Sequence, residues 1–260
     1  MKVYGVDFTS APRRQKPITA AVGTMQGRRL VLEDVLRLSS FAEFEALLRS
    51  PGPWIGGFDF PFGLPRELVR DLGWPGRWRP LVEFCAALSR EQLRAALDAY
   101  RATRPVGRKY AHRATDLPAG SSSPMKLVNP PVALMFHEGA PRLAAAGVHI
   151  PGLAEGDPSR VALEAYPGFF ARSIVGRASY KSDTRAEHTR ERREARRGIL
   201  AAMAIGAPKA LKKAMLEDGS GDTLDAAICA TQAAWGWARR AKGFGLPIRI
   251  DPCEGWIVGA

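Results

Sequence analysis

The sequence contains few cysteines, and their spacing is not that of a zinc site. Cys85, Cys229 and Cys253 are the only three in 260 residues, and they form neither a CxxC pair nor a cysteine and histidine cluster. This pattern argues against a structural zinc and against a disulfide framework. It is typical of a protein in a reducing compartment.

Long apolar runs are also missing. No stretch approaches the length of a membrane-spanning helix, and the first residues lead directly into residues 3–7 without a signal-type apolar segment. We therefore expect a cytoplasmic protein without a membrane partner. The 46% hydrophobic and 25% charged residues are those of a soluble globular protein, and 260 residues suffice for one large domain with an inserted lobe.

Acidic residues are outnumbered, because Lys and Arg exceed Asp and Glu by 12. This excess favours an anionic partner such as nucleic acid. Residues 187–205 predict a basic helix with five arginines, either a solvated face neutralised by neighbouring glutamates or a surface that contacts phosphate. Lys126, Lys181 and Arg193 are candidates for binding substrate phosphate, although each lysine alone is typical of an ordinary protein surface.

The first sixty residues predict a strand, a hairpin, a helix and another strand. Ser40 and Glu43 form a capping-box pattern at the start of the helix. A helix between the third and fourth strands forms a crossover, so the fourth strand can run parallel to the first. Ligands gather at the carboxyl ends of such strands, where Asp7 and Asp59 stand. The expected strands span residues 2–8, 18–25, 30–38 and 54–60, and the helix spans residues 41–49.

The middle of the chain is different, with helical patterns interrupted by a basic and then Ser/Pro-rich stretch at 104–131. We interpret residues 61–155 as a helical insertion within a single domain that covers residues 1–260. The insertion could serve as a lid, a binding surface or the contact of a homodimer. Its expected helices are 66–72, 81–88, 91–103 and 132–146; after it come a strand at 160–168, helices at 169–174, 187–205 and 222–237, and a last strand at 255–258.

Asp222 and Asp225 stand at the start of an Ala-rich helix, three residues apart and therefore on one helical face. Taken alone, such a pair is most often a pair of capping acids. Together with Asp7, Asp59 and Glu164, however, it predicts a cluster of carboxylates that cations must neutralise. Oxygen ligands of this kind favour Mg²⁺ or Mn²⁺, and two such ions can promote phosphodiester cleavage.

The order of elements and acids resembles the ribonuclease-H-like superfamily, including its Holliday-junction-resolvase branch. Six segments are similar to those of a predicted-nuclease family catalogued as domain of unknown function 429, and they cover most of the chain: GVDFTSAP (5–12), GFDFPFGLP (57–65), MKLVNPP (125–131), EAYPG (164–168), GDTLDAAICA (221–230) and EGWIVG (254–259). The resemblance implies an α/β fold with a mixed five-stranded sheet flanked by helices, the insertion after the fourth strand, and an extra C-terminal strand.

The resemblance also implies roles for the acids. Asp7 would be the bridging metal ligand, and Asp222 and Asp225 would complete the metal sites. Asp59 matches the fourth-strand acid, although the resolvase branch commonly has the longer glutamate there. Glu164 has no firm counterpart, and it could be a base behind the ligands or a structural acid.

Three functions remain open at this stage. The first is a metal-dependent nuclease that uses Asp7, Asp59, Glu164, Asp222 and Asp225. The second is a phosphotransferase of the actin and sugar-kinase class, which the absence of a Gly-rich phosphate loop after the first strand disfavours. The third is a non-catalytic nucleic-acid-binding protein, whose binding would be indifferent to metal.

Overall fold

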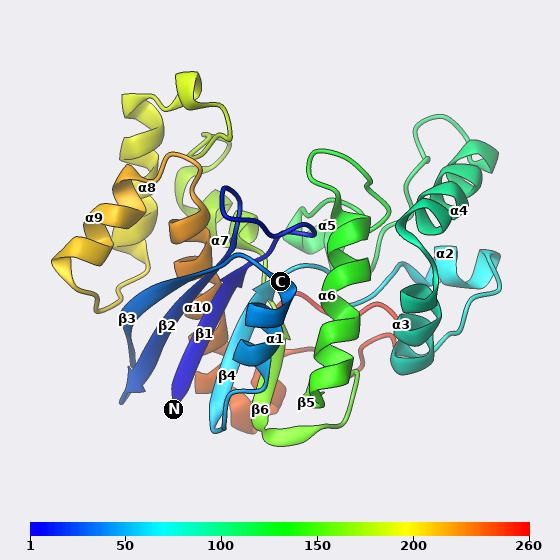
Figure 1. Ribbon diagram of the computed structural model, residues 1–260, viewed down its shortest axis with the longest axis horizontal. Helices are drawn as coiled ribbons and strands as arrows, with labels where there is room; N and C mark the ends of the chain where they lie inside the picture. The colour runs from blue at the N-terminus through cyan, green and yellow to red at the C-terminus, as the bar shows by residue number, and fades with distance from the viewer.

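A mixed sheet of six strands forms the centre of the protein in a computed structural model that describes residues 1–260 (Figure 1). The strand order is β3-β2-β1-β4-β6-β5. The β2 strand is antiparallel to both β1 and β3, whereas β4, β6 and β5 run parallel to β1. The strands are β1 (Lys2–Asp7), β2 (Ile18–Gln26), β3 (Arg29–Leu38), β4 (Trp54–Asp59), β5 (Val148–His149) and β6 (Asp157–Glu164).

Helices cover both faces of this sheet. They are α1 (Phe41–Leu48), α2 (Arg66–Asp71), α3 (Trp78–Ala87), α4 (Arg90–Thr103), α5 (Asp116–Ala119), α6 (Val132–Ala146), α7 (Pro167–Val175), α8 (Arg190–Ala202), α9 (Lys209–Glu217) and α10 (Asp222–Ala238), with short 3₁₀ helices η1 (Arg185–Glu187) and η2 (Arg240–Gly245). None of them combines the length and the apolar character that a membrane crossing requires.

Local sequence signals explain where several helices begin. Ser40 and Glu43 form the expected capping box at α1, and Ser89 with Gln92 forms another at α4. Each box satisfies backbone N–H groups that the first helical turn leaves unpaired. The α1 helix then carries the chain from β3 to β4, which lies beside β1 and parallel to it as predicted.

The sheet separates two apolar layers. One layer packs α10 against β1, β2 and β4, with α7, α8 and α9 around it. The other layer joins the opposite face of the sheet to α1, α3, α4 and α6. The helices of residues 61–155 thus share a core with the sheet, and β5, which lies within this insertion, pairs with β6 at the sheet edge.

Two glycines let α10 approach the sheet closely. A Cβ atom on Gly5 in β1 would lie 2.1 Å from both the Ala226 oxygen and the Ala230 nitrogen, and one on Gly57 in β4 would lie 2.3 Å from the Cys229 oxygen. Backbone atoms cannot yield as a flexible side chain can. Glycine at these positions therefore sets the distance between α10 and the two strands.

Adding one methyl group at Gly5 should destabilise the fold. We expect Gly5→Ala to lower the free energy of unfolding by about 2–3 kcal/mol, because the methyl group must push α10 away from β1. Urea denaturation measures the loss. Gly198→Ala is the matched control, since nothing lies within 4 Å of that Cβ in α8, and alanine should there stabilise the helix by about 0.5–1 kcal/mol. Equal effects at the two sites would contradict this account.

The expected C-terminal strand is wrong. Residues 255–258 contribute only an isolated bridge between Ile257 and Glu164, and the Val258 N–H donates to the Glu164 carbonyl at 2.9 Å. Gly255 and Gly259 have φ values of +75° and +90°, a left-handed conformation that interrupts an extended strand on both sides. The apolar residues between them were the misleading signal.

Other boundaries also differ from expectation. The sheet has six strands and not five, because the two-residue β5 is too short to produce a periodic pattern. The expected helix at 187–205 is divided into η1 and the shorter α8, and the separate α9 and the short α5 were not predicted. The strand and Pro-Gly turn expected at 160–168 are β6, which begins earlier at Asp157 and ends at Glu164, and the start of α7 at Pro167.

Candidate functional site

Asp7 and Asp59 are neighbours at the carboxyl edge of the sheet. They are register partners at the ends of the parallel strands β1 and β4. Because side chains alternate along a strand, Asp7 lies on the same face as Gly5, and Asp59 on the same face as Gly57. This is the face that α10 covers, so both carboxylates meet the beginning of that helix.

The start of α10 brings two further carboxylates to this place. Its N-cap is Gly221, with a φ of +82°, and Asp222 and Asp225 lie in its first turn. The capping role belongs to Asp218, whose carboxylate accepts from the Thr223 N–H at 2.9 Å and from its hydroxyl at 2.6 Å. The side chain that accepts hydrogen bonds from Thr223 at this helix end is therefore that of Asp218, and not that of Asp222 or Asp225.

Asp225 already has two partners. The Tyr180 hydroxyl donates to Asp225 Oδ1 at 2.7 Å, and the Lys181 ammonium forms an ion pair with Asp225 Oδ2. Asp225 is fully buried, whereas the side chain of Lys181 is 42% exposed. Lys181 thus reaches from a loop after α7 and places its charge on the innermost carboxylate.

Burial and the neighbouring negative charges raise the pKa values of three of these acids. Burial raises the pKa of Asp7 well above its usual value, and the charges of Asp225, Asp222 and Asp59 raise it further, against the lowering effect of Lys181. Burial likewise raises the pKa of Asp59 to about 7, with Lys181 opposing the shift. Burial and nearby Asp218 raise the pKa of Asp222. One lysine does not neutralise this group.

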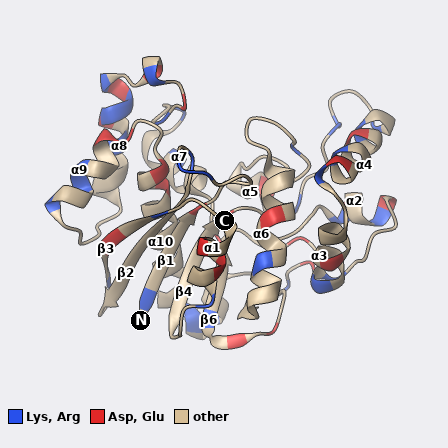
Figure 2. Cartoon of the chain, viewed as in Figure 1, with Lys and Arg blue, Asp and Glu red and all other residues tan.

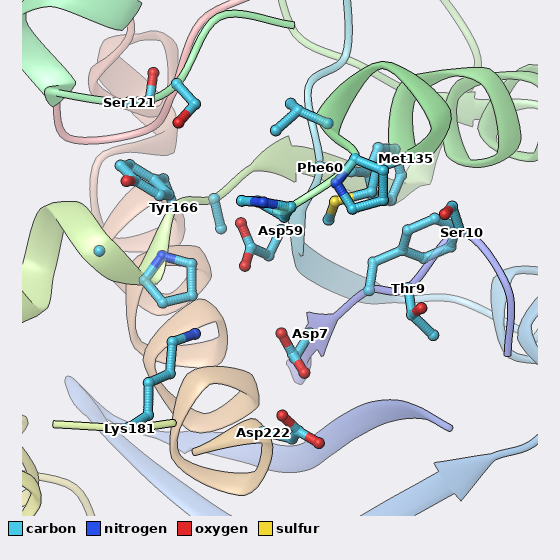
Figure 3. A pocket seen from close by; sticks show the side chains of 18 of the residues that line it. Asp7, Thr9, Ser10, Asp59, Phe60, Ser121, Met135, Tyr166, Lys181 and Asp222 are labelled. Atoms are coloured by element: carbon cyan, nitrogen blue, oxygen red, sulfur yellow. The ribbon is translucent and has the colours of Figure 1, made fainter. Parts of the chain in front are cut away.

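A cavity of about 800 Å³ opens over these residues. Figure 3 shows Asp7, Asp59, Asp222 and Lys181 pointing into it from β1, β4, α10 and the loop after α7. Lys16 adds a second cation to its wall, and side chains of the insertion, including Met135 and Ser121, line the opposite side. The cavity is large enough for a small ligand or for one part of a polymer.

Glu164 lines the same cavity, but it lies apart from the four aspartates. It pairs with Phe58 in the β4–β6 register, so the alternation of side chains sends it to the sheet face opposite Asp59. There Arg113 holds both its oxygens, at 2.7 and 2.8 Å, and the Phe62 N–H donates to it at 2.9 Å. With these oxygens occupied, the structure favours the structural interpretation of Glu164.

Arg113 was expected only as part of a basic loop, but it is almost completely buried. Besides Glu164, its guanidinium donates to Asp116 Oδ1 at 2.9 Å and to the Glu254 carbonyl at 3.0 Å. The carboxylates of Glu164 and Asp116 raise the pKa of Arg113 against the opposing effect of burial. Arg113 therefore ties the insertion to β6 and to the C-terminal segment, and it is not free to bind substrate.

The arginines of α8 mostly have local partners. Arg192, Arg193 and Arg197 form ion pairs with Glu187, Glu217 and Glu194. This arrangement favours a solvated, paired helix face over a surface dedicated to phosphate. Of the three substrate-binding candidates, only Lys181 lines the cavity; Arg193 and Lys126 do not. Figure 2 shows Lys and Arg on α8 and α9 to one side of the sheet and on α4 to the other.

Arg196 differs from these three arginines, and sequence reasoning did not single it out. It is buried, and it donates to the Tyr180 carbonyl at 2.6 Å and to the Leu216 carbonyl at 2.9 Å. It thereby holds the residue before Lys181 in place. The only sequence signal is an apolar spacing that would turn one arginine of the run toward the core.

The donor set fits a hard divalent cation chemically, because it consists of carboxylate oxygens whose charges repel one another. Its spacing is not that of a ready-made site. No three histidine, cysteine, aspartate or glutamate side chains lie close enough together to hold a metal ion. One of the four aspartates, Asp225, is already engaged in an ion pair with Lys181.

Comparison with known proteins supports five of the six segments that carried the resemblance, since residues 254–259 lie outside the matched range. Neither the curated proteins nor the solved structures give a match. A family model described as "Protein of unknown function (DUF429)" matches residues 5–243. This range includes Asp7, Asp59, Lys181, Asp222 and Asp225. Because the match covers most of the chain, the protein belongs to the DUF429 family.

Proposed function

We propose that the protein is a metal-dependent nuclease that hydrolyses phosphodiester bonds in the cavity at the carboxyl edge of β1 and β4. The observation that carries the proposal is the convergence of Asp7, Asp59 and Asp222, from three separate elements, on one cavity that also contains Lys181. Buried acids whose pKa values are raised are a frequent mark of functional sites.

Two further features support this function. The order β3-β2-β1-β4, with only β2 antiparallel to its neighbours, is compatible with the ribonuclease-H-like arrangement that the sequence resembles. The formal charge of +12 favours an anionic polymer as substrate. The chain has one such sheet and not two, which gives no support to a two-lobed phosphotransferase.

Asp7, Asp59 and Asp222 would hold Mg²⁺ or Mn²⁺, with Asp225 available once it is released from Lys181. When bound, such an ion supplies positive charge that activates water and stabilises the leaving oxygen. The protein's own residues set the surroundings. The ammonium groups of Lys16 and Lys181 in the cavity wall can attract a phosphate, and the apolar side chains of Phe8, Phe60 and Met135 limit access of bulk water.

A direct assay tests this function. The purified protein is incubated with single-stranded, branched and RNA–DNA hybrid oligonucleotides in Mn²⁺, with a parallel series in EDTA. We expect cleavage of at least one substrate in Mn²⁺ only. Binding without cleavage that is equally strong in EDTA would instead support the non-catalytic nucleic-acid-binding alternative, which the pairing of Asp225 with Lys181 favours. If the protein neither cleaved nor bound any of these substrates, both functions would be contradicted.

A further inference from the structure

Lys181 occupies the place where a cation is needed. Its ammonium contacts the one fully buried carboxylate of the group, that of Asp225. Its charge also lowers the pKa values of Asp7 and Asp59, against the larger raising effect of their burial. The other cationic side chains of the cavity wall are already paired: the Lys16 ammonium with Asp183 at 3.0 Å, and Arg113 with Glu164 and Asp116.

The residues on both sides of Lys181 anchor its segment through their backbone atoms. Tyr180 is buried in the core next to α10, and Arg196 holds its carbonyl at 2.6 Å. The Ser182 N–H donates to the Gly219 carbonyl at 3.1 Å. Between these two anchors, the Lys181 side chain is 42% exposed. Its ammonium can therefore leave Asp225 by rotation of side-chain bonds alone.

Gly221 provides the route by which the lysine reaches Asp225. A Cβ atom there would lie 2.8 Å from Lys181 Cβ and 2.9 Å from its Cδ, so the lysine stem crosses directly over the glycine. Gly221 also has a φ of +82°, which residues other than glycine rarely adopt. The helix start is thus shaped to admit this side chain.

We propose that the Lys181 ammonium is an internal counter-ion, which offsets part of the negative charge of the carboxylate group in the metal-free protein and is displaced from Asp225 when a divalent cation binds. The proposal rests on the proposed function, because it takes the same carboxylates as the cation site. An ammonium and a metal ion close to the same Asp225 oxygen would repel each other strongly. The exchange would free Asp225 Oδ2, the oxygen that Lys181 occupies in the metal-free protein.

The exchange also moves a positive charge to where a phosphate would bind. A displaced ammonium remains tethered to residue 181 and stays in the wall of the cavity. There it can pair with an anionic substrate and no longer with Asp225. Cation binding and substrate binding are then coupled through one side chain.

Calorimetric titration with Mn²⁺ tests the proposal without any cleavage assay. If Lys181 competes with the ion, Lys181→Met should bind Mn²⁺ about tenfold more tightly than the wild type, which corresponds to removal of one modest competing interaction. Lys126→Met is the control, because it removes the same charge outside the cavity, and it should leave the affinity unchanged. An unchanged or weaker affinity in Lys181→Met, or absence of Mn²⁺ binding in all three proteins, would overturn the proposal.

A second measurement uses the unaltered protein, so it holds even if the variant folds poorly. An amine-acylating reagent should label Lys181 faster in the presence of Mn²⁺ than in EDTA, relative to Lys126, as measured by peptide mass spectrometry. An equal relative rate would overturn the exchange. Tighter Mn²⁺ binding by Lys181→Met in a protein that cleaves no nucleic acid would instead support the exchange and remove the nuclease proposal.

Discussion

Replacing Arg113 with methionine should lower the free energy of unfolding by about 3–5 kcal/mol, the usual cost of removing one partner of a buried ion pair. The guanidinium is 2% exposed, and its partners Glu164 and Asp116 are 3% and 0% exposed. Without it, the two buried carboxylates would keep only weak compensation from the Phe62 N–H, the Ser121 hydroxyl and the backbone N–H of residue 113, which donates to Asp116 at 2.8 Å. Urea denaturation followed by circular dichroism measures the loss.

Two further variants make this prediction specific. Arg70→Met removes a pair with Asp71 in which the arginine is 70% exposed, and it should cost less than about 1 kcal/mol. Adding Glu164→Gln to Arg113→Met should restore part of the lost stability, because it removes one of the two uncompensated charges. If Arg113→Met cost no more than Arg70→Met, or if the double variant were less stable than Arg113→Met, the buried ion pair would not have the role described.

Asp7→Asn should abolish cleavage yet stabilise the metal-free protein. Under the proposed function, loss of a carboxylate that holds the ion should reduce the cleavage rate by at least about 100-fold. The folded state also disfavours the charged form of this carboxylate, because burial and then the charges of Asp225 and Asp222 raise its pKa. An amide of the same shape carries no charge to desolvate, so the free energy of unfolding in EDTA should rise by about 0.5–2 kcal/mol.

The opposite signs of these two effects are what distinguish a functional acid from a structural one. Asp98→Asn serves as the control, since Asp98 is 56% exposed and pairs with Arg101 on the surface of α4. It should change neither the cleavage rate nor the stability by a measurable amount. A loss of stability in Asp7→Asn would indicate a structural carboxylate, and cleavage at the wild-type rate would exclude Asp7 from the site.

The strand-end acids could be predicted because strong local signals precede them. Asp7 and Asp59 each end an apolar, β-favouring run, and the helix at 41–48 between them requires the crossover that makes the two strands parallel. Their direct register pairing then follows from the fold. The placement of Asp222 and Asp225 followed in the same way, from helical spacing at the start of an Ala-rich segment.

The remaining features depend on contacts between distant parts of the chain. The sequence does not show that Lys181 meets Asp225 or that Arg196 turns inward, since each contact joins residues from separate elements. It also counted Glu164 with the other acids, although a shift of one position along a strand changes the sheet face. The C-terminal strand failed because the positive φ angles of Gly255 and Gly259 are invisible to apolar periodicity.

The close packing of α10 on β1 has a consequence for how the chain folds. More than 200 residues separate Gly5 from Ala226, so this contact joins distant parts of the chain. During synthesis, β1 can pair early with β2 and β4, but its α10 face stays uncovered until residues 222–238 have emerged. Contacts of such long sequence separation slow folding and leave apolar surface exposed meanwhile. The carboxylate site therefore forms late, and Val3 of β1 and Ile55 of β4 are among the apolar residues that an incomplete chain would leave open to aggregation.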